Sequence, residues 1–454
     1  MARQGDGRHP SRDRQGAAPF RPDDLFGRTF VCPCGKTHAI EPREVHYGDD
    51  APSRLPEVCG RAASGRAAAV VMDARTRAAA GAAVAAALRQ AGWQADEVVL
   101  SDRPDGASPV CDDDTMRRLR ERLGPAAIVV TVGSGVITDL GKWAAFERGI
   151  PFVAVATAAS MNGYASANVA PTVGGLKTLL RARPPAAVLA SPRVLADAPH
   201  DLTAAGLGDV LAKATSSLDW RANRLLFDDY FCERSVGLVA DLEPLYLEHP
   251  EDIRARRPRA VRALFDALLL TGVAMTMAES SAPASGGEHL VSHALDMMSA
   301  LDGRPHDLHG RQVGVGTVLA ADLWRRVLAV ESPALADAPA AVDEPFWGRL
   351  APAVAEEYAA KAERLRCARA DLTRRWDDLR AALAPEARSP DTIRDCLNRA
   401  GAACRAEDIR CSRARLLAAF RHAHEIRSRF TVLDLAHLVG VLPRAAGEML
   451  EQLG

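Results

Sequence analysis

Residues 126–157 read AAIVVTVGSGVITDLGKWAAFERGIPFVAVAT, and this stretch is the most informative about the fold. It starts with an apolar run (126–133), continues into a segment with helical spacing (138–149) and ends in a second apolar run (151–157). Short apolar runs that alternate with helical segments are typical of a parallel sheet whose strands are buried on both faces. The stretch therefore predicts a β-α-β unit of an α/β domain.

The same alternation extends toward the N-terminus. Apolar strands are predicted at residues 67–73 and 97–102, and helices at residues 75–92 and 113–124. Together with residues 126–157, these segments predict a Rossmann-like parallel sheet that carries helices on its faces.

The pattern changes after about residue 200, where strand signals stop. The following segments have helical spacing, among them residues 201–226, 259–280, 288–301 and 313–330. A chain of 454 residues also exceeds what one hydrophobic core usually serves. We therefore expect an α/β plus all-α protein, with an N-terminal sheet domain (25–200) and a C-terminal helical domain (201–454).

Residues 1–24 differ from the rest in composition. They are rich in Arg, Gly, Pro and Asp and lack any periodic apolar pattern. Such a segment cannot bury enough apolar surface to offset the entropy lost on ordering, so we expect a disordered tail.

Composition limits the classes of function. The formal net charge is -1, which provides no overall field for binding a nucleic acid or an anionic membrane. We expect no membrane span, because no unbroken apolar stretch reaches the ~20 residues that crossing a bilayer requires. Nine cysteines without a dense framework or a secretory signal favour a cytoplasmic protein with reduced thiols. A small-molecule substrate fits these features best.

A glycine-rich turn is the first candidate binding site. Gly133, Ser134 and Gly135 follow a predicted strand and precede a helix that contains Asp139. Backbone amides at such a turn can approach a pyrophosphate, and the helix N-terminus adds partial positive charge. The turn lacks the G-x-G-x-x-G fingerprint, so an ordinary tight turn is an equally good interpretation.

Asp73 is a second candidate. It ends the predicted strand 67–73, where the doubly wound rule places ligand contacts, so its carboxylate could accept hydrogen bonds from ribose hydroxyls. From its position alone, a simple N-cap of the next helix is as good an interpretation.

Candidate metal ligands lie in the helical half of the chain. They are Asp209, His289, His293, His306 and His309. Residues four apart share a helix face, so His289 and His293 point the same way. Carboxylate and imidazole donors suit Zn²⁺, Ni²⁺ or Fe²⁺, and three protein ligands leave positions open for a substrate. The alternative is that the histidines are ordinary core or surface groups.

Cys32, Cys34 and His38 form a third candidate in the segment FVCPCGKTHAI. The C-x-C spacing is tighter than that of the usual zinc knuckle, and no fourth ligand lies nearby in the sequence. We therefore expect a small hairpin that turns at Gly35.

In their order along the chain, these segments resemble one family. The matching stretches are CPCGKTHAI, MDARTRAAAG, VGSGVITDLGKWAAFERGIPFVAVATAASMNGYAS, LTAAGLGDVLAKATSSLDW, SGGEHLVSHALDM, LHGRQVGVGT and RSRFTVLDLAHLVG. The chain resembles the glycerol-1-phosphate dehydrogenases, in particular the bacterial AraM-like branch of the iron-alcohol-dehydrogenase and dehydroquinate-synthase superfamily. The resemblance covers residues 28–445 and implies a homodimer with its active site in a cleft between the two domains.

The resemblance also implies a role for individual residues. One divalent ion (Zn, Ni or Fe) would be bound by Asp209, His289 and His309. The NAD(P)H site would use Asp73, Gly133, Ser134, Gly135, Asp139, Thr157 and Ser160.

The implied reaction is the reversible reduction of dihydroxyacetone phosphate to sn-glycerol 1-phosphate by NADH or NADPH. His293 would face the substrate, and we expect it to take part in protonating the product because imidazole titrates near neutral pH. Lys213 could neutralise the substrate phosphate, or it could pair with a nearby acid.

The chain departs from the family pattern at three positions. Asn162 replaces an aspartate, Ala156 replaces a proline, and Ser191 replaces an aspartate that is common in the family. Asn162 matters most, because an amide cannot serve as a base or as a charged partner. The alternatives are therefore a different phosphorylated or polyol substrate, a cyclase-type reaction as in dehydroquinate synthase, or a homologue that binds nucleotide without turnover.

Overall fold

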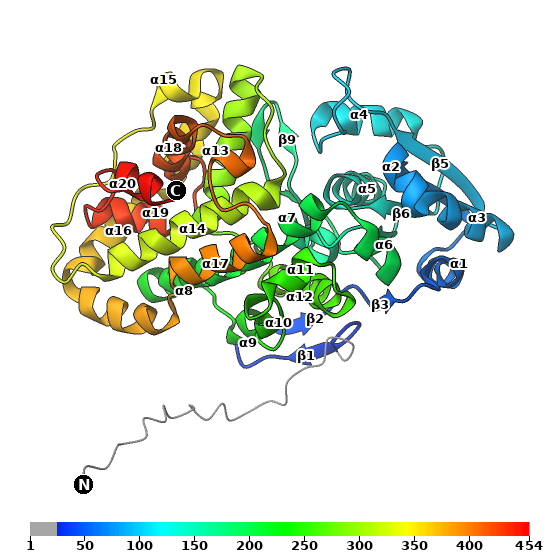
Figure 1. Ribbon diagram of the computed structural model, residues 1–454, viewed down its shortest axis with the longest axis horizontal. Coiled ribbons are helices and arrows are strands. Elements are labelled where there is room, and N and C mark those ends of the chain that lie inside the picture. The colour runs from blue at the N-terminus through cyan, green and yellow to red at the C-terminus, as the bar shows by residue number, and fades with distance from the viewer. Residues whose placement is uncertain (1–24, 454) are drawn as a thin grey trace, which may run out of the picture.

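The computed structural model describes residues 25–453, so the tail predicted at residues 1–24 lies outside the described residues. A parallel sheet with its helices occupies one side of the molecule, and a larger helical part occupies the other (Figure 1). The expected fold class, α/β followed by all-α, is confirmed.

The sheet has six parallel strands in the order β3-β12-β7-β6-β4-β5. Their bounds are β3 (Glu44–Tyr47), β4 (Ala67–Asp73), β5 (Gln94–Leu100), β6 (Ile128–Gly133), β7 (Phe152–Ala156) and β12 (Ala187–Ala190). In register, Val130 of β6 lies between Val70 of β4 and Val153 of β7. Every residue of β6 and β7 is buried, as the apolar runs predict.

Two strands of this sheet were not predicted. β3 lies at the sheet edge, where all four of its residues are only half-buried. Its sequence, EVHY, therefore lacks the apolar run by which buried strands are recognised. β12 is fully buried but has only four residues, AVLA, and a run this short does not distinguish a strand from a helix.

Six helical elements accompany the sheet. They are α1 (Ala51–Ala62), α2 (Ala74–Thr76), α3 (Ala82–Gln90), α4 (Asp113–Arg122), α5 (Gly135–Glu147) and α6 (Pro192–Asp197). The helix predicted at residues 75–92 contains a π-helical turn, η2 (Arg77–Gly81), between α2 and α3. Gly81 packs against the Met72 sulfur at this turn, where a larger residue would clash.

Among the described residues, no strand follows β12. The helices there are α7 (His200–Leu211), α8 (Lys213–Phe227), α9 (Glu233–Gly237), α10 (Glu243–Leu247), α11 (Pro250–Arg254), α12 (Pro258–Ala278), α13 (Gly287–Asp302), α14 (His309–Leu328), α15 (Glu344–Trp347), α16 (Ala351–Leu383), α17 (Pro390–Ala400), α18 (Arg413–His422), α19 (Val432–Leu438) and α20 (Ala446–Gln452). The segment predicted as one helix at residues 201–226 forms two helices, α7 and α8, because the helix is interrupted at Ala212.

Short elements connect these parts. The expected N-terminal hairpin consists of β1 (Thr29–Val31) and β2 (Thr37–Ala39), with Gly35 at a φ of 88° in its turn. A 3-10 turn, η3 (Asn162–Ala165), follows β7. The segment after it forms two small antiparallel pairs from β8 (Asn168–Val169), β9 (Thr172–Val173), β10 (Leu176–Lys177) and β11 (Leu180–Arg181). Further 3-10 turns are η4 (Gly348–Leu350), η5 (Ala384–Glu386), η6 (Glu407–Ile409) and η7 (Ala423–Glu425).

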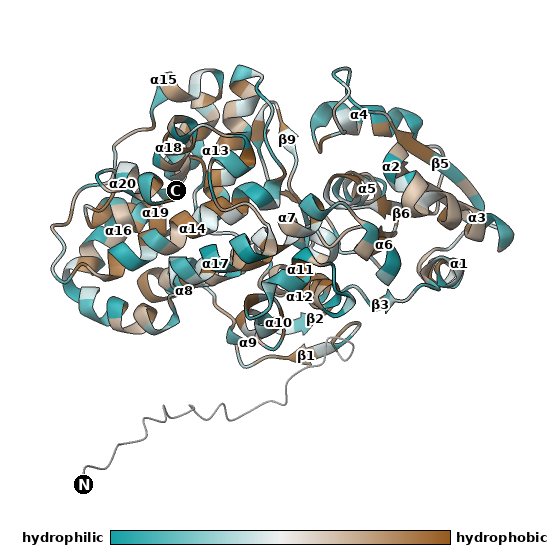
Figure 2. Cartoon of the chain, in the orientation of Figure 1, coloured by the Kyte–Doolittle hydropathy of each residue, from teal (hydrophilic) through white to brown (hydrophobic). Residues whose placement is uncertain are grey.

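α12 is the most apolar long helix of the described residues, and it is the single one whose length and composition would allow it to cross a membrane. Its most apolar window is 83% buried inside the protein, with Leu264 and Phe265 completely covered. In Figure 2, outer helices such as α16 and α17 carry both hydrophobic and hydrophilic residues. α12 packs against η3 and α7 and is therefore a core helix of the fold.

Candidate metal and cofactor site

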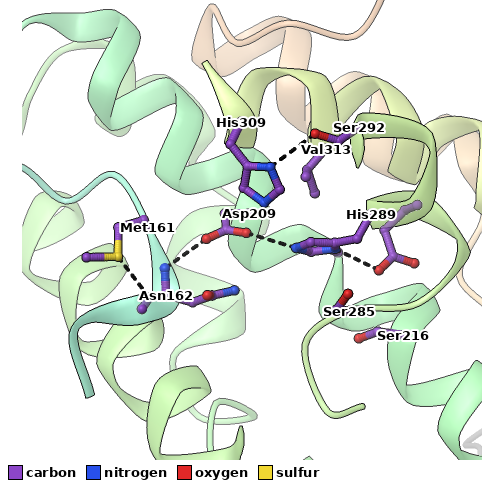
Figure 3. A network of polar contacts seen from close by, with 12 residues as sticks. Met161, Asn162, Asp209, Ser216, Ser285, His289, Ser292, His309 and Val313 are labelled. Carbon is purple, nitrogen blue, oxygen red and sulfur yellow. Dashed lines mark hydrogen bonds and ion pairs between the residues drawn. The ribbon is translucent and has the colours of Figure 1, made fainter. Parts of the chain in front are cut away.

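Three helices meet where the predicted metal ligands lie. α7 carries Asp209, α13 carries His289, and α14 begins at His309. One donor atom from each side chain lies within 4.8 Å of the other two. Figure 3 shows the Asp209 carboxylate between the two imidazole rings and the loop at Asn162. The structure thus brings together the three residues that the resemblance implies.

Glycines allow this convergence. A Cβ atom on Gly208 would overlap the backbone carbonyl of Gly310, and one on Gly310 would overlap that of Ala205. The backbones of α7 and α14 therefore touch at positions where only glycine fits. Because each glycine is next to a ligand, this contact places Asp209 against His309.

The other two histidines considered from the sequence are not in this donor set. The His306 side chain is 39% exposed, and its Nδ1 lies 3.4 Å from an oxygen of Asp296. The His293 ring is stacked beside that of His309 with centroids 5.6 Å apart, but its nitrogens are not part of the three-atom cluster. His293 is therefore a neighbour of the candidate metal site and lies outside its donor set.

Hydrogen bonds orient the three ligands. Glu288 is fully buried, and its Oε1 lies 3.0 Å from Nδ1 of His289. Ser292 Oγ lies 3.1 Å from Nδ1 of His309, and the backbone N–H of Asn162 donates to Oδ2 of Asp209 at 2.8 Å. Outer partners of this kind fix the tautomer and direction of metal-binding side chains. Sequence reasoning did not identify Glu288, although a carboxylate directly before His289 was a usable signal.

The remaining donor atoms face one another. Asp209 Oδ1 is buried and forms no hydrogen bond within residues 25–453, although Nε2 of His289 lies 3.3 Å away. Burial alone would lower the pKa of His289, but the neighbouring carboxylates of Asp209 and Glu288 raise it to about 9. Burial and the neighbouring His289 lower the pKa of His309 to about 4. A carboxylate and two imidazoles that converge in this way fit a divalent cation.

Positive charge surrounds His293. Its pKa lies well below the ordinary value because of burial, with smaller contributions from Arg427, His309 and Lys177. Its Nδ1 is buried and has no hydrogen-bond partner among the described residues. Lys177 is mostly buried, 3.6 Å from the carboxylate of Asp296. Lys177 and Arg427 were not singled out from the sequence, since neither forms a motif with the histidines.

Lys213 lies at the first position of α8. Its ammonium is buried without a hydrogen-bond partner in the described part of the chain. Burial lowers its pKa to about 8, with the carboxylate of Glu243 acting in the opposite direction. Lys177, in contrast, is among the charges that lower the pKa of both His293 and His309.

The glycine-rich turn lies at the switch point of the sheet. β5 lies on one side of β4, and β6, the next strand along the chain, lies on the other side. The carboxyl ends of β4 and β6 therefore flank the position where ligands bind such sheets. α5 begins directly after β6, and no side chain caps its N-terminus. A Cβ on Gly133 would be 2.5 Å from Cβ of Ile137, so glycine is required there. The free amides of α5 suit a pyrophosphate.

Asp73 caps the next helix. Its Oδ1 accepts the backbone N–H of Thr76 at 2.8 Å, and its Oδ2 lies 3.3 Å from Nη2 of Arg75. The N-cap interpretation is thus observed, and the ribose contact stays a prediction.

Asp139 contacts the loop that follows η3. Its Oδ1 lies 3.4 Å from Nζ of the buried Lys142, and its Oδ2 accepts the backbone N–H of Ala170 at 3.3 Å. Lys142 also donates to the backbone carbonyls of Gly163 at 2.7 Å and Asn168 at 2.9 Å. Both side chains therefore hold this loop in place.

One short loop connects the cofactor turn with the metal centre. Thr157 donates its backbone N–H to the carbonyl of Gly133 at 3.1 Å, and Asn162 contacts Asp209 at the other end of the loop. Ser160 lies between them and is buried. Thr157 and Ser160, for which nicotinamide contacts are predicted, therefore lie in a loop that contacts both the glycine-rich turn and the candidate metal site.

A parallel sheet with a glycine-rich turn at its switch point, next to helices that present an Asp-His-His donor set, is the arrangement of a metal-dependent dehydrogenase that uses a dinucleotide. Residues 46–199 match the family model described as iron-containing alcohol dehydrogenase. The chain belongs to the glycerol-1-phosphate dehydrogenase family. It is 33% identical to the NAD(P)+-dependent glycerol-1-phosphate dehydrogenase of Bacillus subtilis, covering 66% of this chain and 76% of that protein.

Other comparisons agree. The corresponding protein of Pyrococcus furiosus is 36% identical, covering 64% of this chain and 82% of that protein. Among solved structures, glycerol dehydrogenase from Schizosaccharomyces pombe covers 90% of this chain and 91% of its own, with a TM-score of 0.57 and 14% identity. A 1,3-propanediol oxidoreductase covers 92% of this chain and 100% of its own, with a TM-score of 0.57 and 18% identity. These two structures support the fold alone.

Proposed function

We propose that this protein is a metal-dependent glycerol-1-phosphate dehydrogenase that reduces dihydroxyacetone phosphate with NADH or NADPH and catalyses the reverse oxidation. The observation that carries the proposal is the cluster of Asp209, His289 and His309, whose donor atoms lie within 4.8 Å of one another, in a chain of this family. A bound divalent ion would supply a Lewis acid for the ketone oxygen, and the nicotinamide would supply the hydride.

The metal ligands are preorganised by their neighbours. Glu288 keeps the Nδ1 side of His289 occupied, so that Nε2 faces Asp209. Ser292 does the same for His309, directing the other ring nitrogen toward the donor cluster. The side chains thus hold their positions before an ion or substrate arrives, which lowers the reorganisation cost of binding.

The substrate phosphate has two candidate partners. Lys177 lies 3.6 Å from Asp296 of α13, and both Lys177 and Arg427 are close enough to His293 to help lower its pKa. Arg427 is mostly buried, and burial lowers its pKa. A buried guanidinium favours an anionic partner, because an uncompensated buried charge is costly. We therefore assign phosphate recognition to these two residues in preference to Lys213.

His293 would carry the proton. Because its pKa is well below the ordinary value, the imidazole is neutral near pH 7. A neutral ring has one N–H donor and one acceptor nitrogen, so it can pass a proton between product oxygen and solvent without starting as an imidazolium. This refines the role expected from the sequence.

Turnover with defined substrates tests the proposal. Purified protein loaded with Zn²⁺, Ni²⁺ or Fe²⁺ is mixed with dihydroxyacetone phosphate and NADH or NADPH, and cofactor oxidation is followed by absorbance. We expect one cofactor oxidised per substrate, with sn-glycerol 1-phosphate as the product enantiomer. Absence of cofactor oxidation with all three metals and both cofactors would exclude this substrate.

A second candidate substrate class follows from Asn162. Within the described residues its side-chain amide makes no hydrogen bond, and only its backbone N–H contacts Asp209. The amide is therefore available to a substrate that differs from the one for which the family uses an aspartate, such as another phosphorylated or polyol compound. The Asn162→Asp variant discriminates the two. A higher rate with dihydroxyacetone phosphate favours the inherited activity, and an unchanged or lower rate favours a different substrate.

The assembly and location of the enzyme belong to the same proposal. The family resemblance supports a homodimer, which light scattering on the purified protein can check. All nine cysteines are free, which agrees with a reducing, cytoplasmic environment.

A further inference from the structure

A second cluster of metal-binding side chains lies outside the dehydrogenase site. Cys32, Cys34 and His38 come from the hairpin of β1 and β2, and Cys232 precedes the first residue of α9. One donor atom from each of the four lies within 4.8 Å of the others. The sequence offered only the first three. The fold supplies the fourth from a segment 194 residues beyond His38.

The distances fit a tetrahedral zinc site. Sγ of Cys32 and Sγ of Cys232 are 3.8 Å apart, and Nε2 of His38 is 3.3 Å from Sγ of Cys34 and 3.9 Å from Sγ of Cys232. With Zn–S bonds of about 2.3 Å and Zn–N bonds of about 2.05 Å, a tetrahedron has S–S edges of about 3.8 Å and S–N edges of about 3.6 Å. The atoms are thus spaced as ligands of one ion.

A disulfide does not describe this cluster. The cysteines are all free, and the 3.8 Å between the two closest sulfurs is well above the roughly 2.05 Å of an S–S bond. The hairpin turn instead brings the thiols of Cys32 and Cys34 toward one point. Cys32 donates its backbone N–H to the carbonyl of Lys36 at 2.9 Å, and Gly35 donates to the carbonyl of Cys32 at 3.0 Å.

The surroundings suit thiolate ligands. The backbone N–H of Ser235 donates to Sγ of Cys232 at 3.4 Å, and the hydroxyl of Tyr230 lies 3.2 Å from Sγ of Cys34. Donors that point at sulfur stabilise its negative charge and orient it, as outer partners do at metal sites. Cys32, His38 and Cys232 are buried, so an ion among them would be shielded from solvent.

We propose that Cys32, Cys34, His38 and Cys232 bind a structural Zn²⁺ that fastens the N-terminal hairpin to the helical part of the protein. Four protein ligands leave no position open for a substrate, which is the mark of a structural site. Figure 1 shows the hairpin beside α9, and its two strands are not part of the six-stranded sheet. A two-stranded hairpin is marginally stable alone, so an ion shared with Cys232 gives it a fixed place.

Metal content tests this site separately from the dehydrogenase site. Wild-type protein, Cys232→Ser and the control Cys367→Ser are loaded with Zn²⁺, freed of loose metal by gel filtration and analysed by mass spectrometry of elements. Cys367 is exposed and lies outside the cluster, so its variant controls for the loss of a thiol. We expect two zinc ions per chain in the wild type and in Cys367→Ser, and one in Cys232→Ser.

Cobalt substitution provides a readout that does not depend on whether Cys232→Ser folds. Co²⁺ bound by three thiolates shows strong sulfur-to-cobalt charge-transfer absorption in the near ultraviolet, which the Asp-His-His site cannot produce. We expect this absorption in the wild type and in His289→Ala. Equal zinc content in Cys232→Ser and Cys367→Ser, a Co²⁺ protein without the absorption, or a Cys32–Cys232 disulfide in the purified protein would each overturn the proposal.

Discussion

At the scale of single residues, the metal centre depends on which nitrogen of each histidine is free. Glu288 and Ser292 occupy the Nδ1 sides of His289 and His309, and the remaining nitrogens meet at Asp209. His293 is in the same group of rings, but its nitrogens take no part in the donor cluster. The two histidines of the donor cluster therefore differ from His293 in what their ring nitrogens face.

This difference predicts opposite outcomes for two similar variants. His289→Ala removes a ligand and should abolish metal retention at this site together with activity. His293→Ala should retain the metal and lose about 10²–10⁴-fold in kcat, the usual contribution of a proton-transfer group. Metal analysis and initial rates on both variants check this, and a His289→Ala protein with wild-type metal content would refute the ligand assignment.

The raised pKa of His289 gives metal binding a pH dependence. Because the pKa is about 9 in the metal-free protein, His289 carries a proton at neutral pH that an incoming ion must displace. His309 has a lowered pKa of about 4 and is already neutral. Zn²⁺ affinity should therefore rise about tenfold per pH unit between pH 7 and 9 and level off above that range.

Proton release measures this directly. In a Cys232→Ser background, where the cysteine cluster is impaired, a pH indicator should report about one proton released per Zn²⁺ bound at pH 7 and none at pH 10. Zn²⁺ affinity that stays the same across this range would contradict a protonated His289.

Phosphate recognition is a prediction that separates two lysines. Lys177→Met should raise the KM for dihydroxyacetone phosphate about tenfold or more, because a hydrogen bond to a charged group contributes about 1.5–3 kcal/mol. The KM for NADPH should not change. Lys213→Met is the matched comparison and should leave both values close to wild type, whereas a larger effect of Lys213→Met would restore the role that the sequence suggested for it.

At the scale of elements, the site depends on how closely α7 and α14 approach. Gly208 and Gly310 lie at the point of backbone contact, and each is adjacent to a ligand. Overpacking a well-packed interface costs about 1–3 kcal/mol. Gly310→Ala should lower the free energy of unfolding by that amount and weaken metal binding, since the two helices must separate.

Gly447→Ala is the control for this substitution. Gly447 is also helical, in α20, but a Cβ there would meet no atom within 4 Å. Because alanine favours helices by up to about 1 kcal/mol over glycine, this variant should be as stable as wild type or more so. Denaturant unfolding of both variants with and without Zn²⁺ compares them, and equal stability would show that the contact has no role in the site.

Elements with a clear apolar period were predictable from the sequence, and elements at the sheet edge were not. β4, β6 and β7 have long buried apolar runs, which the alternation pattern detects. β3 is half-exposed, and its pairing with β12 depends on residues about 140 positions further along the chain. The π-helical turn η2 depends on how Gly81 packs against Met72, which no local pattern contains.

At the scale of the whole molecule, the loop from Thr157 to Asn162 connects the sheet domain with the helices that carry the candidate metal ligands. It begins against Gly133, at the cofactor turn, and ends against Asp209, at the metal centre. One short segment therefore joins the candidate cofactor turn to the candidate metal site.

The sequence singled out the three candidate ligands but not the groups around them. Asp209, His289 and His309 belong to recognisable motifs, and the helices bring them together as the resemblance implies. Lys177, Arg427 and Cys232 come from segments whose proximity is a property of the tertiary fold. Their contribution to a site could be found only once distances between distant parts of the chain were known.

Restoring metal to the depleted enzyme tests the central claim most directly. The ion is removed from the Asp209, His289 and His309 site with a chelator, and reduction of dihydroxyacetone phosphate by NADPH is measured as Zn²⁺, Ni²⁺ or Fe²⁺ is added back. We expect no activity in the depleted protein and full activity when this one site is filled. Full activity in the depleted protein, with the site shown to be empty, would contradict this claim.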